Sequence, residues 1–233
     1  MPWNFPLVQV ARGVAPALAA GNTAIVKPAE QTPHSAILLA DLLAESGLPS
    51  GVYSVVTGYG QPVGEALSAH PEVNHVTFTG SVRTGKSVMC AAASHVASVT
   101  LELGGKSPVV VLEDADLDEA VAGIVKAISL NAGQVCSAGS RLVVQRAVQD
   151  EVVGRVCEAL SGLTIGHGLA NPGLGPIVSA EQLRRVDDLV TTAKQRGAVA
   201  VIGSGRLTLT GAEEGFFYSP TVLMARDATA IEV

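Results

Sequence analysis

The chain of 233 residues has few charges, few aromatic side chains and few cysteines. Charged residues make up 15% of it and aromatic residues 3%, whereas 48% of it is hydrophobic. This apolar content excludes an intrinsically disordered protein, because such a chain can bury enough surface to fold. The net charge of −6 provides no basic surface for a phosphate backbone. We therefore expect no nucleic-acid partner.

The three cysteines, Cys90, Cys136 and Cys157, are far apart and form no CxxC pair. Their spacing predicts neither a disulfide framework nor a zinc ribbon. The five histidines also lack the spacing of metal ligands, so we expect no metal site. With no pattern that calls for oxidation, a reducing, cytoplasmic location is the expectation.

Signals for secretion and for membrane insertion are also missing. No basic stretch follows Met1, as it would in a secretory signal peptide. The longest apolar stretch near the start, residues 7–20, is interrupted by Gln9, Arg12 and Pro16. It is too short and too interrupted to cross a bilayer, so we expect no membrane association.

Helical and strand patterns alternate along the chain, which predicts an α/β fold with a doubly wound parallel, Rossmann-like sheet. Gly104 and Gly105 mark a predicted boundary between one domain over residues 1–103 and part of a second α/β domain over residues 104–233. In the first domain we expect strands at residues 23–26, 51–56, 73–78 and 96–102, and helices at 6–20, 32–46, 62–69 and 86–94. In the second we expect strands at 108–112, 141–145 and 198–202, helices at 117–130, 149–160 and 180–195, and an extended segment at 216–223.

Cys136 is the candidate nucleophile. It lies in Asn131-Ala-Gly-Gln-Val-Cys-Ser-Ala-Gly-Ser-Arg141, a small loop bracketed by glycines between a helical and a strand pattern. A thiol on such a loop is placed to attack, whereas a buried thiol is inert, which is what we expect of Cys90 and Cys157. One carboxylate, Glu102, lies upstream. A nucleophilic Cys136 would make the chain an enzyme that forms a thio-adduct.

Residues 80–87, Gly80-Ser-Val-Arg-Thr-Gly-Lys-Ser87, match the spelling of a Walker A phosphate loop between a strand and a helix. A P-loop nucleotidase that uses Gly80, Lys86 and Ser87 is therefore an alternative hypothesis. The nucleotidase hypothesis is weaker because a P-loop enzyme leaves Cys136 and Glu102 without a role. A strand-to-helix turn also offers backbone N–H groups to the phosphates of a dinucleotide.

Five segments, in this order, resemble those of the NAD(P)-dependent aldehyde dehydrogenase superfamily: Pro2-Trp-Asn-Phe-Pro6, Lys27-Pro-Ala-Glu-Gln-Thr-Pro33, Phe78-Thr-Gly-Ser81 with Gly85, Glu102-Leu-Gly-Gly-Lys-Ser-Pro108 and Gly133-Gln-Val-Cys136. The resemblance extends from end to end of the chain. It implies that residues 1–103 are a dinucleotide-binding domain and that residues 104–233 are part of a catalytic domain. It also implies oxidation of an aldehyde to a carboxylic acid.

In this resemblance Cys136 attacks the aldehyde carbonyl and forms first a thiohemiacetal and then a thioester. The side-chain amide of Asn4 and the backbone N–H of Cys136 would hold the oxyanion. Glu102 would act as general base on the water that hydrolyses the thioester.

The resemblance also implies a set of cofactor contacts. Lys27 and Glu30 would contact the adenosine ribose, and Gly80 and Ser81 the pyrophosphate. A carboxylate at Glu30 accepts a 2′-hydroxyl and repels a 2′-phosphate, so we expect NAD, with NADP possible because Lys27 tolerates a phosphate. Trp3, Leu103 and Glu232 complete the expected set of cofactor-binding residues.

Members of this superfamily are considerably longer than 233 residues, and both ends of the chain stop inside family motifs. We therefore expect a fragment that lacks both termini, from a parent that forms a homo-dimer or homo-tetramer. A catalytically inactive aldehyde-dehydrogenase-like fragment is the second alternative. The residues around Cys136 are small and do not select one aldehyde.

Overall fold

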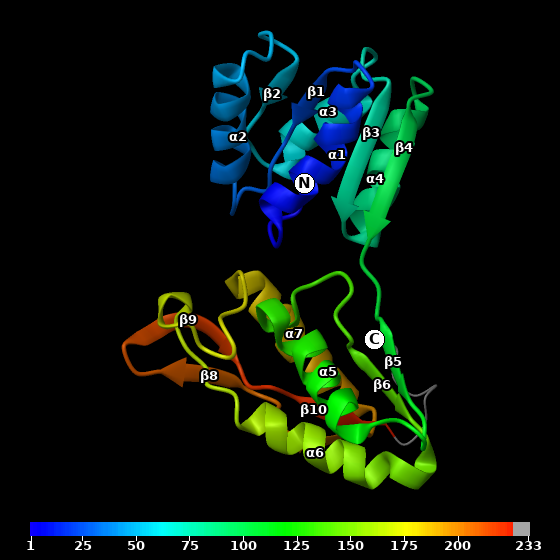
Figure 1. The fold of residues 1–233 in the computed structure, drawn as a ribbon, viewed down its shortest axis with the longest axis vertical. Coiled ribbons are helices and arrows are strands. Elements are labelled where there is room, and N and C mark those ends of the chain that lie inside the picture. The colour runs from blue at the N-terminus through cyan, green and yellow to red at the C-terminus, as the bar shows by residue number, and fades with distance from the viewer. Residues whose placement is uncertain (226–233) are drawn as a thin grey trace. The chain divides into compact units, whose positions relative to one another are not determined.

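The computed structural model describes residues 1–225 (Figure 1). The chain divides into two compact units, Met1–Gly104 and Gly105–Val233, and each is described by itself. The division falls between the two glycines of the Gly104-Gly105 pair, one residue after the boundary expected from the sequence.

Unit 1 alternates helices and strands. Its elements are α1 (Pro6–Ala19), β1 (Ala24–Val26), α2 (His34–Glu45), β2 (Tyr53–Val55), the single turn η1 (Gly60–Gly64), α3 (Glu65–Ala69), β3 (His75–Gly80), α4 (Val82–Ala93) and β4 (Ser98–Leu103). β1 pairs with β2 and β3 with β4, both in parallel. Parallel strands joined by helices confirm the predicted α/β class. Among residues 1–225 no pairing joins β1 to β3, so the expected sheet is present as two parallel pairs.

Helices α1 and α2 pack against the β1–β2 pair. Val10 and Val14 are four residues apart, which puts them on one face of α1, and both are buried against Val26 of β1. Ala36 of α2 and Tyr53 of β2 complete the buried cluster. The cluster fixes the carboxyl end of β1, where Lys27 follows.

Helix α4 begins at Val82, four residues earlier than the predicted start at residue 86. The hydroxyl of Ser81 caps it by accepting a hydrogen bond from the backbone N–H of Thr84 at 3.2 Å. Gly85, expected in a loop, is buried in the helix. A Cβ at this position would lie 2.6 Å from a methyl group of Leu103. The glycine is therefore needed for close packing of α4 on β4, which periodicity alone does not reveal.

Unit 2 combines one parallel strand pair with two antiparallel pairs. Its elements are β5 (Pro108–Val111), α5 (Leu117–Ser129), η2 (Leu130–Gly133), β6 (Arg141–Val144), η3 (Arg146–Val148), α6 (Gln149–Ser161), η4 (Gly168–Ala170), α7 (Ala180–Gln195), β7 (Val199–Ile202), β8 (Arg206–Leu209), β9 (Ala212–Tyr218) and β10 (Val222–Met224). β5 pairs with β6 in parallel, and β7–β10 and β8–β9 are antiparallel.

The sequence interpretation missed β8. Leu209 pairs with Ala212, so Thr210 and Gly211 form a two-residue hairpin loop, with Gly211 at φ 78°.

The core of unit 2 lies between helices α5 and α6 and the strands they cover. Val111, Ile124 and Val152 are buried there together with Val156 and Leu160. Ile202 of β7 and Val222 of β10 pack against the same cluster. The opposite side of the β5–β6 pair is not covered in this way, and Val110 and Val143 are more than half exposed.

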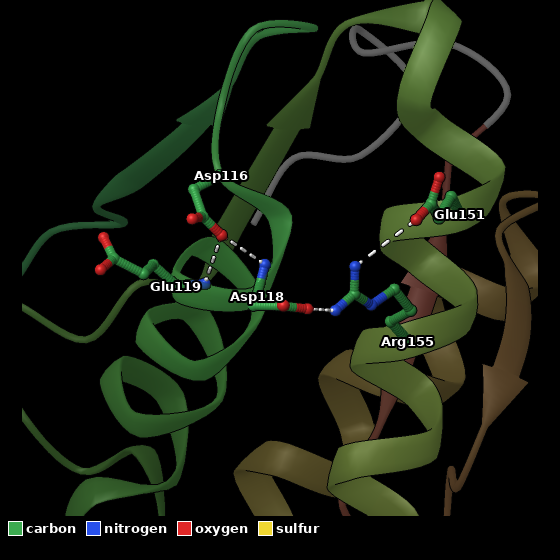
Figure 2. Close-up of polar contacts among 5 residues, drawn as sticks. All are labelled: Asp116, Asp118, Glu119, Glu151 and Arg155. Atoms are coloured by element: carbon green, nitrogen blue, oxygen red, sulfur yellow. Dashed lines mark hydrogen bonds and ion pairs between the residues drawn. The ribbon is translucent and has the colours of Figure 1, made fainter.

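Asp116 caps α5 (Figure 2). Its carboxylate accepts the backbone N–H groups of Asp118 at 2.9 Å and Glu119 at 3.2 Å. Arg155 of α6 forms ion pairs with Asp118 and with Glu151. The Arg155–Asp118 pair joins the first turn of α5 to α6, whereas the Arg155–Glu151 pair lies within α6.

Within the described part of the chain, no helix is both long and apolar enough to cross a membrane. The same residues contain no group of three or more histidine, cysteine, aspartate or glutamate side chains placed to hold a metal ion.

Candidate active site

Four of the predicted site residues meet at the carboxyl edge of the β3–β4 pair. The register places Thr79 opposite Glu102 and Gly80 opposite Leu103, and Ser81 follows directly. In open α/β sheets, ligands bind outside the carboxyl ends of the strands. The structure therefore brings one proposed catalytic carboxylate next to the proposed pyrophosphate turn.

The turn between β3 and α4 has little room for side chains. A Cβ on Gly80 would lie 2.6 Å from the ring of Phe78. Ser81 is the N-cap of a helix of 12 residues, whose first N–H groups have no partner within the helix. Backbone N–H groups at the start of a helix can bind an anionic oxygen.

The Walker A spelling does not produce a phosphate loop. In a P-loop, the residues between the two glycines wrap the phosphates in an open loop. Here Val82 to Ser87 already belong to α4, and Lys86 is exposed in its second turn. Early capping by Ser81 closes the segment into a helix, so the nucleotidase alternative is not supported.

Lys27 and Glu30 lie together after β1, as the proposed ribose contacts require. The Lys27 ammonium donates to the carbonyls of Pro28 at 2.8 Å and Gly58 at 2.7 Å. It lies 3.7 Å from the Glu30 carboxylate, which accepts the N–H of Gly60 at 3.1 Å. The pair is thus held by the two loops that follow β1 and β2.

Trp3 and Asn4 precede α1 and lie next to the same loop. The Trp3 carbonyl accepts the hydroxyl of Thr32 at 3.2 Å. The amino group of Met1 donates to the carbonyl of Lys27 at 2.8 Å, and burial lowers its pKa to about 6. Asn4 is half-buried. The contacts of Met1 and Trp3 therefore hold the segment directly before Asn4 against the Lys27–Thr32 loop.

Glu102 forms an ion pair with Arg12 of α1, which the sequence interpretation did not predict. The two side chains are 45% and 56% exposed, so the pair contributes only about 0–1 kcal/mol to stability. The sequence indicates that Arg12 needs a partner, because it is the one charged residue in an otherwise uncharged helix. Its partner, 90 residues further along the chain, could not be identified from sequence.

Cys136 is exposed on the loop between η2 and β6. The backbone enters this loop through consecutive left-handed residues, Asn131 at φ 51°, Ala132 at 55° and Gly133 at 73°. Such a conformation costs a residue with a side chain about 1–2 kcal/mol. Beyond the thiol, the N–H of Ala138 bonds to the carbonyl of Val135 at 3.1 Å. Cys136 is thus at the tip of a tight turn.

Gln134 connects this turn to a distant segment. Its side-chain NH₂ group donates to the carbonyls of Asn131 at 3.0 Å and Pro176 at 3.2 Å. Its side-chain oxygen accepts the N–H of Val178 at 2.9 Å. We gave Gln134 no role from sequence, although it stands two residues before the candidate nucleophile.

The other cysteines differ from each other. Cys157 is buried as predicted, and burial raises the pKa of its thiol. Cys90 is exposed on α4, so the prediction that it is a packing residue is wrong. The apolar face of α4 is formed by Val88 and Ala92 instead. Exposure alone therefore does not distinguish Cys136 from Cys90; the local backbone does.

The predicted site residues belong to both units. Asn4, Glu102 and the cofactor contacts up to Leu103 are in unit 1, and Cys136 is in unit 2. Glu232, the remaining predicted cofactor contact, lies outside the described residues. Within unit 1, the structure groups the predicted residues at the ends of β1, β3 and β4.

Residues 1–231 match the aldehyde dehydrogenase family, and the chain belongs to that family. A hydroxyisobutyraldehyde dehydrogenase of Mycolicibacterium austroafricanum is 45% identical over 225 residues, which cover 96% of this chain and 44% of that protein. The chain thus spans about half the length of the curated relatives it matches.

Solved structures agree with this assignment. A betaine aldehyde dehydrogenase of Staphylococcus aureus, in complex with NAD⁺, has a TM-score of 0.95 at 38% identity, covering 98% of this chain and 45% of that one. An Escherichia coli NADP-dependent enzyme has a TM-score of 0.90 at 40% identity, covering 98% of this chain and 47% of that one.

Proposed function

We propose that this chain carries the nucleophile, the general base and most cofactor contacts of an NAD(P)-dependent aldehyde dehydrogenase. The observation that carries the proposal is the exposed thiol of Cys136 at the tip of a tight, hydrogen-bonded turn. Membership of the family supports it, because relatives named for aldehyde oxidation match nearly the whole chain.

In the proposed reaction, the Cys136 sulfur attacks the carbonyl carbon of an aldehyde, and a C–S bond forms as the C=O π bond opens. The amide of Asn4 and the backbone N–H of Cys136 hold the resulting oxyanion. NAD(P), when bound, supplies the hydride acceptor for the oxidation. Glu102 takes a proton from the water that then displaces the Cys136 thiolate from the thioester and releases the acid.

The proposed cofactor site fits a dinucleotide. The turn at Gly80 and Ser81 offers backbone N–H groups to a pyrophosphate, and Glu30 offers a carboxylate to a ribose hydroxyl. Lys27 lies 3.7 Å from Glu30 and offsets part of its repulsion for a 2′-phosphate. We therefore propose NAD as the preferred cofactor and NADP as an accepted one.

The proposed setting is cytoplasmic, with a small aldehyde as substrate and with no nucleic-acid or membrane partner. We also propose that the parent enzyme is a homo-dimer or homo-tetramer.

The test compares two exposed cysteines. The purified full-length parent enzyme is incubated with NAD and a panel of small aldehydes, and NADH and the mass of each cysteine-containing peptide are measured. We expect NADH formation and an acyl group on Cys136, both abolished in Cys136→Ala and retained in Cys90→Ala. Equal behaviour of the two variants would favour the catalytically inactive, aldehyde-dehydrogenase-like alternative.

A further inference from the structure

The turn before Cys136 needs support from outside itself. Asn131 and Ala132 have positive φ angles, a conformation that is unfavourable for alanine above all and that persists where the surrounding structure holds it. Ala132 is half-buried and packs against the cluster of Ile177, Leu183 and Tyr218. The turn is therefore held against a core formed by distant parts of unit 2.

Gln134 supplies the polar part of that support. Its NH₂ group donates to the carbonyl of Asn131, the first left-handed residue, at 3.0 Å, and to the carbonyl of Pro176 at 3.2 Å. Its oxygen accepts the N–H of Val178 at 2.9 Å. One side chain thus joins the strained turn to a segment more than 40 residues away.

That segment is itself well anchored. Ile177, between the two residues that Gln134 contacts, is buried, and its N–H donates to the carbonyl of Phe216 on β9 at 2.8 Å. Ser179 then caps α7. Gln134 therefore bonds to a backbone whose position is set by β9 and α7, and it transfers that position to the turn.

The chemistry of the contacts selects glutamine. The position requires N–H donors and an oxygen acceptor on one flat group. Glutamate would place a second oxygen against the carbonyls of Asn131 and Pro176 and remove the donors. Asparagine has the right groups but is one methylene shorter, and methionine has the length without the polarity.

We propose that Gln134 is a positioning residue for Cys136: it holds the left-handed turn in the conformation from which the thiol attacks a carbonyl. This rests on the proposed role of Cys136 as nucleophile. Because carbonyl attack depends on angle and distance, a shift of the thiol by about 1 Å can reduce its rate about 100-fold. Alkylation by a small, freely diffusing reagent depends mainly on the exposure of the thiol.

The experiment measures both reactions of Cys136 in the full-length parent enzyme. p-Nitrophenyl acetate reports carbonyl attack, since the thiolate forms a thioester and p-nitrophenolate leaves. Iodoacetamide reports alkylation. Peptide mass spectrometry assigns each product, and exposed Cys90 provides the reference in the same sample. In Gln134→Met we expect acylation of Cys136 to fall at least about tenfold, with its alkylation and both reactions of Cys90 changed less than about threefold.

Hydrogen exchange gives an independent readout. In Gln134→Met, we expect the Val178 amide to exchange faster, while amides in the middle of α6 remain protected. Gln134→Glu, which keeps an acceptor for Val178, should protect that amide and still lose acylation. If Gln134→Met does not fold, Gln134→Asn and Gln134→Glu are compared in the same way.

The outcomes separate the two proposals. If the wild-type chain acylates Cys136 no faster than Cys90, the nucleophile proposal fails. If the wild type acylates Cys136 and the Gln134 variants match it, the positioning proposal alone is overturned. A parallel fall in acylation and alkylation would also overturn it, since the side chain would then only maintain the fold.

Discussion

Two of the three proposed catalytic side chains, Glu102 and Cys136, are positioned in different ways. Glu102 lies on a regular strand, whose register with β3 fixes its backbone, and its side chain is half-exposed and paired with Arg12. Cys136 lies on an irregular turn with left-handed residues, held by hydrogen bonds from Gln134. Secondary structure therefore positions the proposed base, whereas a few specific side-chain contacts hold the turn of the proposed nucleophile. We expect the first to tolerate neighbouring substitutions better than the second.

The largest expected effect comes from removing the base and leaving the nucleophile. Glu102→Gln keeps the shape of the side chain but cannot accept the proton from water, so turnover should fall about 10²–10⁴-fold. One equivalent of NADH per active chain should still form in a rapid burst, because acylation of Cys136 does not require Glu102. An unchanged steady-state rate would show that Glu102 is not the base.

A smaller effect is expected from the packing of α4 against β4, the strand that carries Glu102. Gly85→Ala places a methyl group 2.6 Å from Leu103, and we expect a loss of about 1–3 kcal/mol in the free energy of unfolding. The control is Gly123→Ala in α5, where a Cβ would meet nothing within 4 Å. That variant should gain up to about 1 kcal/mol from its higher helix propensity. Denaturant titration of both variants decides whether the packing of β4 is as tight as the structure indicates.

The anchor behind the nucleophile turn is tested through Tyr218. Its hydroxyl donates to Asp187 at 3.1 Å, and burial, followed by this bond, raises the pKa of Tyr218 to about 12. The protonated tyrosine is thus favoured in the folded state. Its contribution is fully present below pH 10 and is lost as the pH rises through about 12. Tyr218→Phe should cost about 1 kcal/mol at neutral pH.

Thermal denaturation across the alkaline range checks this sign. The wild type and Tyr218→Phe should converge as the pH approaches the raised pKa. A difference between them that grows with pH would contradict the assignment.

The smallest expected effect concerns the partner of Glu102. Arg12→Gln removes an exposed ion pair, so stability should change by less than about 1 kcal/mol and the difference should shrink in high salt. A loss above 2 kcal/mol, measured by denaturant titration, would show that the pair contributes more to stability than its exposure indicates.

Local patterns predicted the regular elements well. α7 has the predicted bounds, residues 180–195, because Ser179 caps an amphipathic helix that Gly197 follows. The start of α4 was missed, since a buried glycine in a helix is explained only by its neighbour Leu103. The β8–β9 hairpin was missed because the alternating polar and apolar residues at 206–209 were not recognised as a strand that precedes the Thr210-Gly211 turn.

The sequence suggests candidate site residues, whose roles stay predictions, but it does not indicate the contacts among them. Motifs indicated Cys136, Glu102 and the turn at Gly80. They carried no information on which groups surround each residue, because Arg12 and Glu102 are 90 residues apart. Gln134 and Pro176 are 42 residues apart and meet only through the packing of unit 2.

The left-handed turn before Cys136 has a consequence for chirality. Ala132 adopts a backbone conformation that its mirror image prefers, since a D-amino acid favours positive φ for the same steric reason that an L-amino acid avoids it. A semisynthetic chain with D-alanine at position 132 should therefore be more stable than the natural chain, which has L-alanine there. At position 132, the natural stereochemistry opposes the conformation that the fold requires.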